Sequence, residues 1–122
     1  SNTNHIDFAP AAAWTRFFAE RLIGRTLPFD VDILKIEVPD NATPATPWRV
    51  TRQSRAPFYH PYCTSTDLQH PGRIRWRQYI DPAAEPDSDI RAVADKVVSV
   101  TPLSLDLTSR LPLGDLASWL GE

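Results

Sequence analysis

The sequence predicts a single α/β domain with an N-terminal helix and core strand, a long antiparallel β-hairpin arm and a short C-terminal helix. Three observations support this prediction. The 122 residues match the length of one ordinary domain. Hydrophobic residues make up 42% of the chain and charged residues 23%, which is typical of globular proteins. Apolar residues recur at helical spacing near the N-terminus and alternate, as in strands, further along the chain.

Residues 11–23 have the pattern of an amphipathic helix. Asp7 is a suitable N-cap, and Pro10 falls in the first turn, where its missing N–H does no harm. Apolar positions at i, i+3, i+4 and i+8 form one stripe, which consists of Trp14, Phe17, Phe18 and Leu22. We expect this stripe to pack in the core rather than to bind a ligand.

Residues 31–38 predict the core strand, which ends at Pro39. One face of this strand is apolar and consists of Leu34, Ile36 and Val38. The opposite face carries the charged residues Lys35 and Glu37. We therefore expect one side of the strand to lie on the core and the other to be polar.

Residues 48–53 and 73–80 predict two further strands, and we expect them to be the two sides of an antiparallel arm spanning residues 48–80. Within the arm the only acidic residue is Asp67. Its basic residues are Arg49, Arg52, Arg55, Arg73, Arg75 and Arg77, and its large aromatic residues are Trp48, Phe58, Tyr59, Tyr62, Trp76 and Tyr79. This mixture favours a subunit interface first, a solvated hairpin face second and a polyanion contact third.

The acidic loop 81–89 contains two aspartates, Asp87 and Asp89, that flank Ser88. They could form a weak cation site, but we favour a solvated loop in which Ser88 or Asp89 caps the next helix. The other elements expected are a helix over 90–95, a strand over 97–101, an extended segment over 103–108 and a C-terminal helix over 113–121.

Composition and motif spacing argue against several function classes. The net charge of −2 argues against a dedicated nucleic-acid binder, and no apolar run approaches the ~18–20 residues of a membrane span. His5, His60 and His70, with a single cysteine, fit no zinc pattern. The four glycines form no phosphate-binding loop. The lone Cys63 has no internal disulfide partner, and this predicts a reducing, cytoplasmic location.

Four segments resemble a known family when taken in order. Residues 88–108 resemble the C-terminal signature of the survival protein E (SurE) nucleotidases, including its strand that ends in Thr-Pro-Leu. Residues 34–39 resemble a core strand of that family, although Lys35 and Glu37 replace two asparagines. Residues 49–52 resemble the Arg-Val-Thr-Arg motif, and Trp119 with Leu120 matches the closing helix.

The resemblance implies a parent enzyme rather than an active fragment. SurE nucleotidases are metal-dependent phosphatases that hydrolyse nucleoside monophosphates. They hold Mg²⁺ or Mn²⁺ with adjacent aspartates, a serine and an asparagine of an N-terminal portion. None of these motifs occurs here, and the chain has no methionine, so we expect a C-terminal piece of a longer protein. No catalytic, cofactor-binding or metal-binding residue can be carried over, and we expect the chain by itself to be inactive.

The resemblance also implies a homo-oligomer, either a dimer or a tetramer, built by the hairpin and the C-terminal helix. The interface candidates are Trp48, Arg52, Trp76, Tyr79, Asp106 and Trp119. Two alternatives remain open at this point. The arm could be a basic and aromatic module that binds nucleic acid or another polyanion, or the chain could be a purely structural oligomerisation domain.

Overall fold

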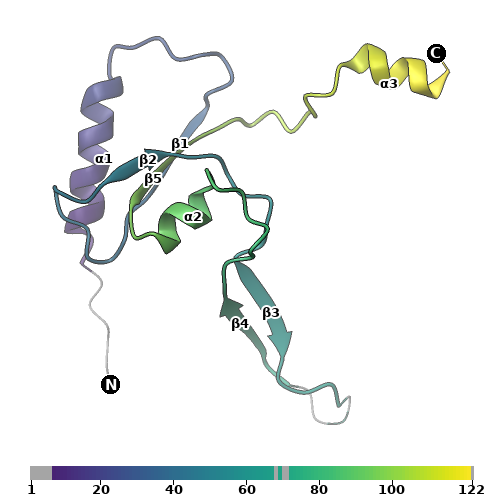
Figure 1. The fold of residues 1–122 in the computed structure, drawn as a ribbon, viewed down its shortest axis with the longest axis horizontal. Helices are drawn as coiled ribbons and strands as arrows, with labels where there is room; N and C mark the ends of the chain where they lie inside the picture. Colours follow the sequence, from purple (N-terminus) through teal and green to yellow (C-terminus); the bar gives the residue numbers. More distant parts are fainter. Residues whose placement is uncertain (1–6, 68, 70–71, 122) are drawn as a thin grey trace.

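A computed structural model describes residues 7–67, 69 and 72–121 and confirms the α/β class. Three helices and two sheets occur in this part of the chain (Figure 1). In chain order the elements are α1 (Ala9–Leu22), β1 (Ile33–Glu37), β2 (Trp48–Val50), β3 (Tyr59–Cys63), β4 (Ile74–Gln78), α2 (Asp89–Ala94), β5 (Val98–Leu103) and α3 (Leu113–Leu120).

Helix α1 supplies one side of the core, as its apolar stripe predicts. Trp14 and Phe18 are each only 5% exposed, and they pack with Ala42, Val98 and Val100. The helix begins two residues earlier than expected. The N-cap position is Phe8 rather than the predicted Asp7, but Asp7 Oδ1 accepts a hydrogen bond from the Ala9 N–H of the first turn at 2.9 Å.

The core sheet has the strand order β1-β5-β2, with β1 antiparallel and β2 parallel to the central β5 (Figure 1). Alternation gives β5 two different faces. Val98 and Val100 belong to the core cluster beneath α1. Ser99 and Thr101, also buried, therefore lie on the opposite face. The partly buried Leu34, Ile36 and Val38 extend the same core, as the sequence predicts.

The expected pairing of residues 48–53 with 73–80 is wrong. Strand β2 belongs to the core sheet, where Trp48 pairs with Val98 and Val50 with Val100. Its position has a physical reason: the Trp48 ring packs edge-on against Phe18, with centroids 5.4 Å apart. The arm hairpin is shorter than expected, since its strands are β3 and β4.

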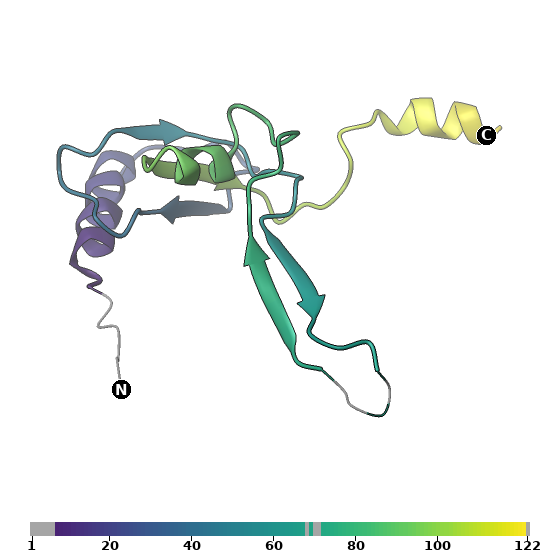
Figure 2. The same ribbon diagram turned by 60° about the horizontal axis from the view of Figure 1, so that its bottom comes forward.

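The arm projects away from the sheet, and α3 stands apart at the end of residues 104–112 (Figures 1 and 2). Helix α3 is confirmed, and it ends at Gly121 in the left-handed conformation, with φ of 83°. Residues 104–108, expected to continue as an extended segment, contain no strand. No helix among the described residues is long and apolar enough to cross a membrane.

Candidate functional site

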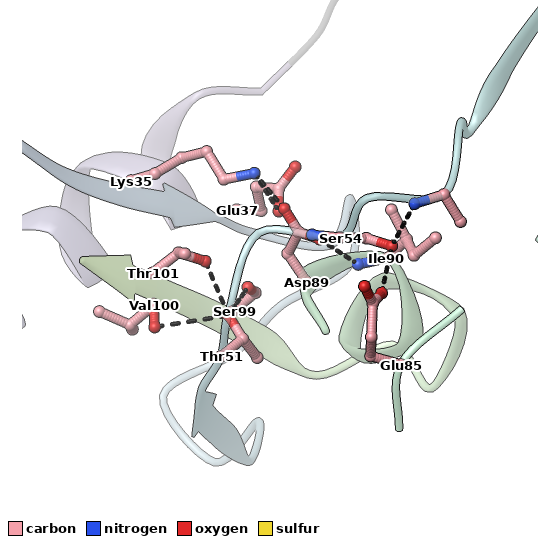
Figure 3. A network of polar contacts seen from close by, with 11 residues as sticks. Lys35, Glu37, Thr51, Ser54, Glu85, Asp89, Ile90, Ser99, Val100 and Thr101 are labelled. Atoms are coloured by element: carbon pink, nitrogen blue, oxygen red, sulfur yellow. Dashed lines mark hydrogen bonds and ion pairs between the residues drawn. The ribbon is translucent and has the colours of Figure 1, made fainter. Parts of the chain in front are cut away.

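A buried cluster of three hydroxyl groups joins β2 to β5 on the polar face of the core sheet (Figure 3). Thr51 Oγ1 lies 2.7 Å from both Ser99 Oγ and Thr101 Oγ1. The Thr51 N–H donates to the Val100 carbonyl at 2.9 Å. All three hydroxyl-bearing residues are buried, so their hydrogen bonds replace those that water would provide.

Next to this cluster, Lys35 of β1 and Asp89 of α2 form an ion pair (Figure 3). Asp89 is only 3% exposed. Burial is the largest single influence on both groups and disfavours their charges, but their mutual hydrogen bond and the other hydrogen bonds and charges nearby together outweigh it. The pKa of Lys35 is therefore raised and that of Asp89 is lowered from their ordinary values. Glu37 adds a second ion pair, with its Oε2 3.3 Å from Lys35 Nζ.

The chain leaves the core for the arm at residues 52–55, and carboxylates hold this root in place (Figure 3). The Ser54 N–H donates to Asp89 Oδ1 at 2.9 Å, and the Ser54 hydroxyl donates to Glu85 Oε2 at 2.7 Å. Hydrogen bonds from Ser54, its own backbone and Arg55 lower the pKa of Glu85. The arm root, residues 52–55, is therefore hydrogen bonded to the middle and to the end of loop 81–89, through which the chain returns from the arm.

The solvated-loop interpretation of residues 87–89 is wrong for Asp89, because this carboxylate is buried and fully engaged by Lys35, Ser54 and Ile90. Ser88 occupies the N-cap position, but its side chain makes no capping hydrogen bond. Asp87 pairs with Arg52 Nε at 2.9 Å.

No group of three or more His, Cys, Asp or Glu side chains able to hold a metal ion occurs among residues 7–67, 69 and 72–121. The two aspartates that flank Ser88 are committed to Arg52 and Lys35. The residues present therefore do not fit a catalytic Mg²⁺ or Mn²⁺, which requires several oxygen ligands around one ion.

A cleft of about 450 Å³ lies at the carboxyl end of β1. Its charged lining side chains are Glu37, Asp40 and Lys96, and its remaining lining is Val38, Pro39, Asn41, Ala42, Thr46 and Val93. This lining includes no histidine, cysteine or serine. It therefore lacks the usual pairing of a nucleophile with a histidine base.

The interface candidates of the arm lie on opposite faces of the hairpin. Trp76, opposite Pro61, is 62% exposed. The Tyr79 ring stacks on His60 with centroids 3.7 Å apart and remains 52% exposed. Both positions are thus available to a partner, although the two rings do not form one patch.

Trp48 and Arg52 lie in the body of the protein rather than on the hairpin, contrary to expectation. Trp48 is 46% exposed and packs on α1. The Arg52 backbone forms a bridge with residues 87–89, since its N–H donates to Asp87 O and its carbonyl accepts from Asp89 N–H. Arg52 thus helps to position the arm root.

The last two candidates belong to the C-terminal segment. Asp106 Oδ1 accepts a hydrogen bond from the Thr108 N–H at 2.8 Å, so this side chain closes a local turn. Hydrogen bonds from the Thr108 side chain and backbone lower the pKa of Asp106. Trp119 on α3 is 70% exposed.

His60 and Cys63 do not form a catalytic pair. The His60 ring stacks on Tyr79, and the Cys63 thiol donates to the Ser65 carbonyl at 2.8 Å. The other two histidines, His5 and His70, lie outside the described residues.

Two features of the site are absent from the sequence-based prediction. The alternation in β5 was a usable signal for the hydroxyls of Ser99 and Thr101, since it places them on the face away from the valines. No local signal pointed to the pairing of Lys35 with Asp89, because the two residues are 54 positions apart.

Comparisons with known proteins find relatives that are named SurE nucleotidases. The 5'-nucleotidase SurE of Thermococcus kodakarensis is 32% identical over 111 residues, covering 87% of this chain and 41% of the relative. The 5'/3'-nucleotidase SurE of Edwardsiella ictaluri is 39% identical over 95 residues, covering 74% of this chain and 36% of the relative. The 5'-nucleotidase SurE of Myxococcus xanthus is 35% identical over 119 residues, covering 94% of this chain and 44% of the relative. No family model matches the sequence.

The fold is similar to the crystal structure of the SurE protein from Aquifex aeolicus, with a TM-score of 0.61 and 23% identity. The similarity covers 96% of this chain and 48% of that one. At this identity the likeness concerns the fold alone. The chain spans less than half of the length of each of these relatives.

Proposed function

Because the chain is homologous to the SurE nucleotidases over most of its length, we propose that it is the C-terminal, oligomer-forming part of a metal-dependent 5'/3'-nucleotidase. The parent enzyme would hydrolyse the phosphate ester of nucleoside monophosphates. The observation that carries this proposal is an identity of 32–39% to proteins named as nucleotidases, of which the chain covers 36–44%.

The distribution of apolar side chains supports the oligomer-forming role. The arm and α3 lie away from the core, yet both expose large hydrophobic residues. The most exposed of these are Ile74 at 71%, Trp76 at 62%, Leu113 at 70%, Trp119 at 70% and Leu120 at 77%. Large hydrophobic side chains that remain exposed together on one element are common at protein interfaces. In this proposal Trp76 and Trp119 are the buried anchors of contacts with other copies of the chain.

The metal site belongs to another part of the parent enzyme in this proposal. The described residues offer no set of ligands for Mg²⁺ or Mn²⁺. The role of this chain is then to hold the arm at a fixed angle through Asp89 and Glu85 and to join subunits. We also place the parent in the cytoplasm, where a free Cys63 stays reduced.

Phosphatase assays test whether the metal site of the parent enzyme lies outside this chain. The purified chain is incubated with nucleoside monophosphates and Mn²⁺, and released phosphate is measured. We expect no turnover above the rate of the metal alone. Turnover at the rate of an ordinary enzyme would overturn the claim that the metal site lies elsewhere.

Light scattering tests the oligomer. We expect the chain to have the mass of a dimer or tetramer and Trp76→Ser and Trp119→Ser to shift it towards the monomer. Phe29→Ser is a matched control, because Phe29 is 99% exposed but lies on the body between α1 and β1. A monomeric wild-type chain, or an equal shift in the control, would contradict the interface.

The alternative of a structural domain without an enzymatic parent makes a different prediction. The gene of such a protein would encode no adjacent aspartates following a strand upstream of this segment. The homology to proteins named as nucleotidases favours the enzymatic parent.

A further inference from the structure

The arm has two faces of different chemistry. Residues directly opposite each other in an antiparallel pair lie on the same side. The register of β3 with β4 therefore collects Tyr59, Pro61, Cys63, Ile74, Trp76 and Gln78 on one side, which is mostly apolar and is called the apolar face. It collects His60, Tyr62, Arg75 and Arg77 on the other, and Arg73 and Tyr79 continue that side beyond the strand ends. We call this second side the basic face.

Ring contacts agree with this assignment. The guanidinium carbon of Arg77 lies 4.4 Å from the centroid of the Tyr62 ring. The rings of His60 and Tyr79 are nearly parallel, at 13°. The basic face thus combines aromatic rings held by their neighbours with guanidinium groups on the same surface.

Within the described part of the chain, the arginines of the basic face have no acidic partner, unlike Arg16, Arg49 and Arg52. Arg73, Arg75 and Arg77 are exposed, and none of them forms an ion pair with any residue that the structure describes. In contrast, Arg49 pairs with Asp95 and Arg52 with Asp87. Three uncompensated positive charges in a row favour an anionic ligand, although the whole chain carries a net charge of −2.

The spacing of these arginines suits a chain of phosphates. Alternate residues of a strand are about 6.7 Å apart. Two nucleotide steps of a helical single strand also rise by about 6.8 Å. A strand of nucleic acid that runs along the arm can therefore present every second phosphate to a guanidinium group.

We propose that the basic face binds single-stranded nucleic acid, with Arg73, Arg75 and Arg77 contacting phosphates and the rings of Tyr62 and Tyr79 stacking with bases. The aromatic rings favour a ligand that has bases over a bare phosphate chain. The apolar face stays free for a partner copy. The basic face is opposite the side that carries Trp76, although it includes the interface candidate Tyr79, and the inference does not depend on phosphatase activity.

Fluorescence anisotropy with a labelled 15-nucleotide oligothymidylate and the whole chain tests the proposal. Three phosphate contacts to a single strand predict a salt slope of about −2, since each contributes about −0.7. The affinity should then fall about 20-fold between 50 mM and 200 mM salt. Absence of binding at low salt, or binding that does not respond to salt, would overturn the proposal.

A charge-matched pair of variants locates the site. Changing Arg73, Arg75 and Arg77 together to glutamine should weaken binding at least tenfold at low salt. The control changes Arg16, Arg25 and Arg110 to glutamine, which lowers the net charge equally but alters arginines outside the arm. Far-ultraviolet circular dichroism checks that both variants are folded, and the single variant Arg75→Gln is measured as well. Equal losses in the triple variant and its control, or no loss in Arg75→Gln, would overturn the assignment.

Tyrosine variants separate bases from phosphates. Tyr62→Leu and Tyr79→Leu should each weaken oligothymidylate binding about fivefold or more, because one stacked base contributes about 1 kcal/mol or more. The same variants should leave the binding of inorganic polyphosphate unchanged. If polyphosphate binds as tightly as the oligonucleotide and neither tyrosine matters, the ligand is a bare phosphate chain and the proposal is wrong.

Discussion

Removing one charge at Asp89 tests how the arm root is attached to the core. Asp89→Asn keeps the size of the side chain and the Oδ1 acceptor that receives the N–H groups of Ser54 and Ile90. It replaces the oxygen facing Lys35 with an NH₂ group. The Lys35 ammonium then meets a donor instead of a carboxylate, while the two backbone hydrogen bonds retain a weaker, neutral acceptor.

The expected loss of stability in Asp89→Asn follows from how exposed the side chains of Asp89 and Lys35 are. Breaking a fully buried ion pair by removing one partner costs about 3–5 kcal/mol. Here the Asp89 side chain is 4% exposed but that of Lys35 is 31% exposed, so water and the remaining ion pair with Glu37 partly stabilise the Lys35 ammonium. We expect Asp89→Asn to lower the free energy of unfolding by about 2–3 kcal/mol. Asp87→Asn, which breaks an exposed pair in the same loop, should cost less than about 1 kcal/mol.

Urea unfolding provides the measurement, since the fluorescence of the buried Trp14 reports on the core. The double variant Lys35→Asn/Asp89→Asn should recover part of the loss, because it removes the ammonium that Asp89→Asn alone leaves facing an amide NH₂ group. A coupling energy of about 1 kcal/mol or more is expected. If Asp89→Asn unfolds at the same urea concentration as the wild type, or if the two single effects simply add, the reasoning is refuted.

The same pair predicts how stability depends on pH. Burial opposes the charge of Asp89, but hydrogen bonds from Lys35, Ser54 and Ile90 lower its pKa in the folded state. On acidification Asp89 therefore binds a proton in the unfolded state at a higher pH than in the folded state. The contribution of the Asp89 charge to folding stability is fully present above the ordinary aspartate pKa, and it is lost as the pH falls through the lower pKa of the folded state. Asp89→Asn should show a smaller loss of stability below about pH 4 than the wild type does.

Three other changes should have equally specific effects. Phe18→Ala should lower the free energy of unfolding by about 3–5 kcal/mol, whereas Phe29→Ala, at a 99% exposed side chain, should change it by less than about 0.5 kcal/mol in the same urea titration. Thr51→Val should lower the free energy of unfolding by about 1–3 kcal/mol, because it leaves the buried hydroxyls of Ser99 and Thr101 without this partner. Thr51→Ser keeps the hydroxyl and should lower it less. Similar losses in the two variants would contradict a role for the hydroxyl. Gly72→Ala should disturb the arm tip, since a Cβ would lie 2.3 Å from Ser65 N; unchanged amide chemical shifts at the tip would disprove this clash.

The family and most of the elements were accessible from sequence because they depend on local patterns. The stripe of α1, the alternation of β1 and the position of α3 all follow from side-chain periodicity, which a short segment contains in full. The motif over residues 88–108 carried the resemblance to SurE proteins, which the relatives confirm.

The site was less accessible. The sequence predicted Asp89 to be an exposed residue of a helix cap, because Asp is common at helix starts and the neighbours of Asp89 in the sequence are polar. Only the packing of α2 against the core sheet buries Asp89 and brings it to Lys35 of strand β1. The pairing of β2 was missed for a related reason: alternation indicates a strand without indicating its partner.

The sequence by itself determined most of the helices and strands and which of their faces are apolar, because these properties are set within a few residues. Strand β3 is the exception, since the sequence placed the first side of the arm at residues 48–53. Only the tertiary structure decided that β2 joins β5 in parallel, that the arm begins at β3 and that Lys35 meets Asp89. Such contacts join residues far apart in the chain. They form where the burial of Trp14, Phe18 and the β5 valines fixes the relative positions of α1 and the sheet, which no local pattern specifies.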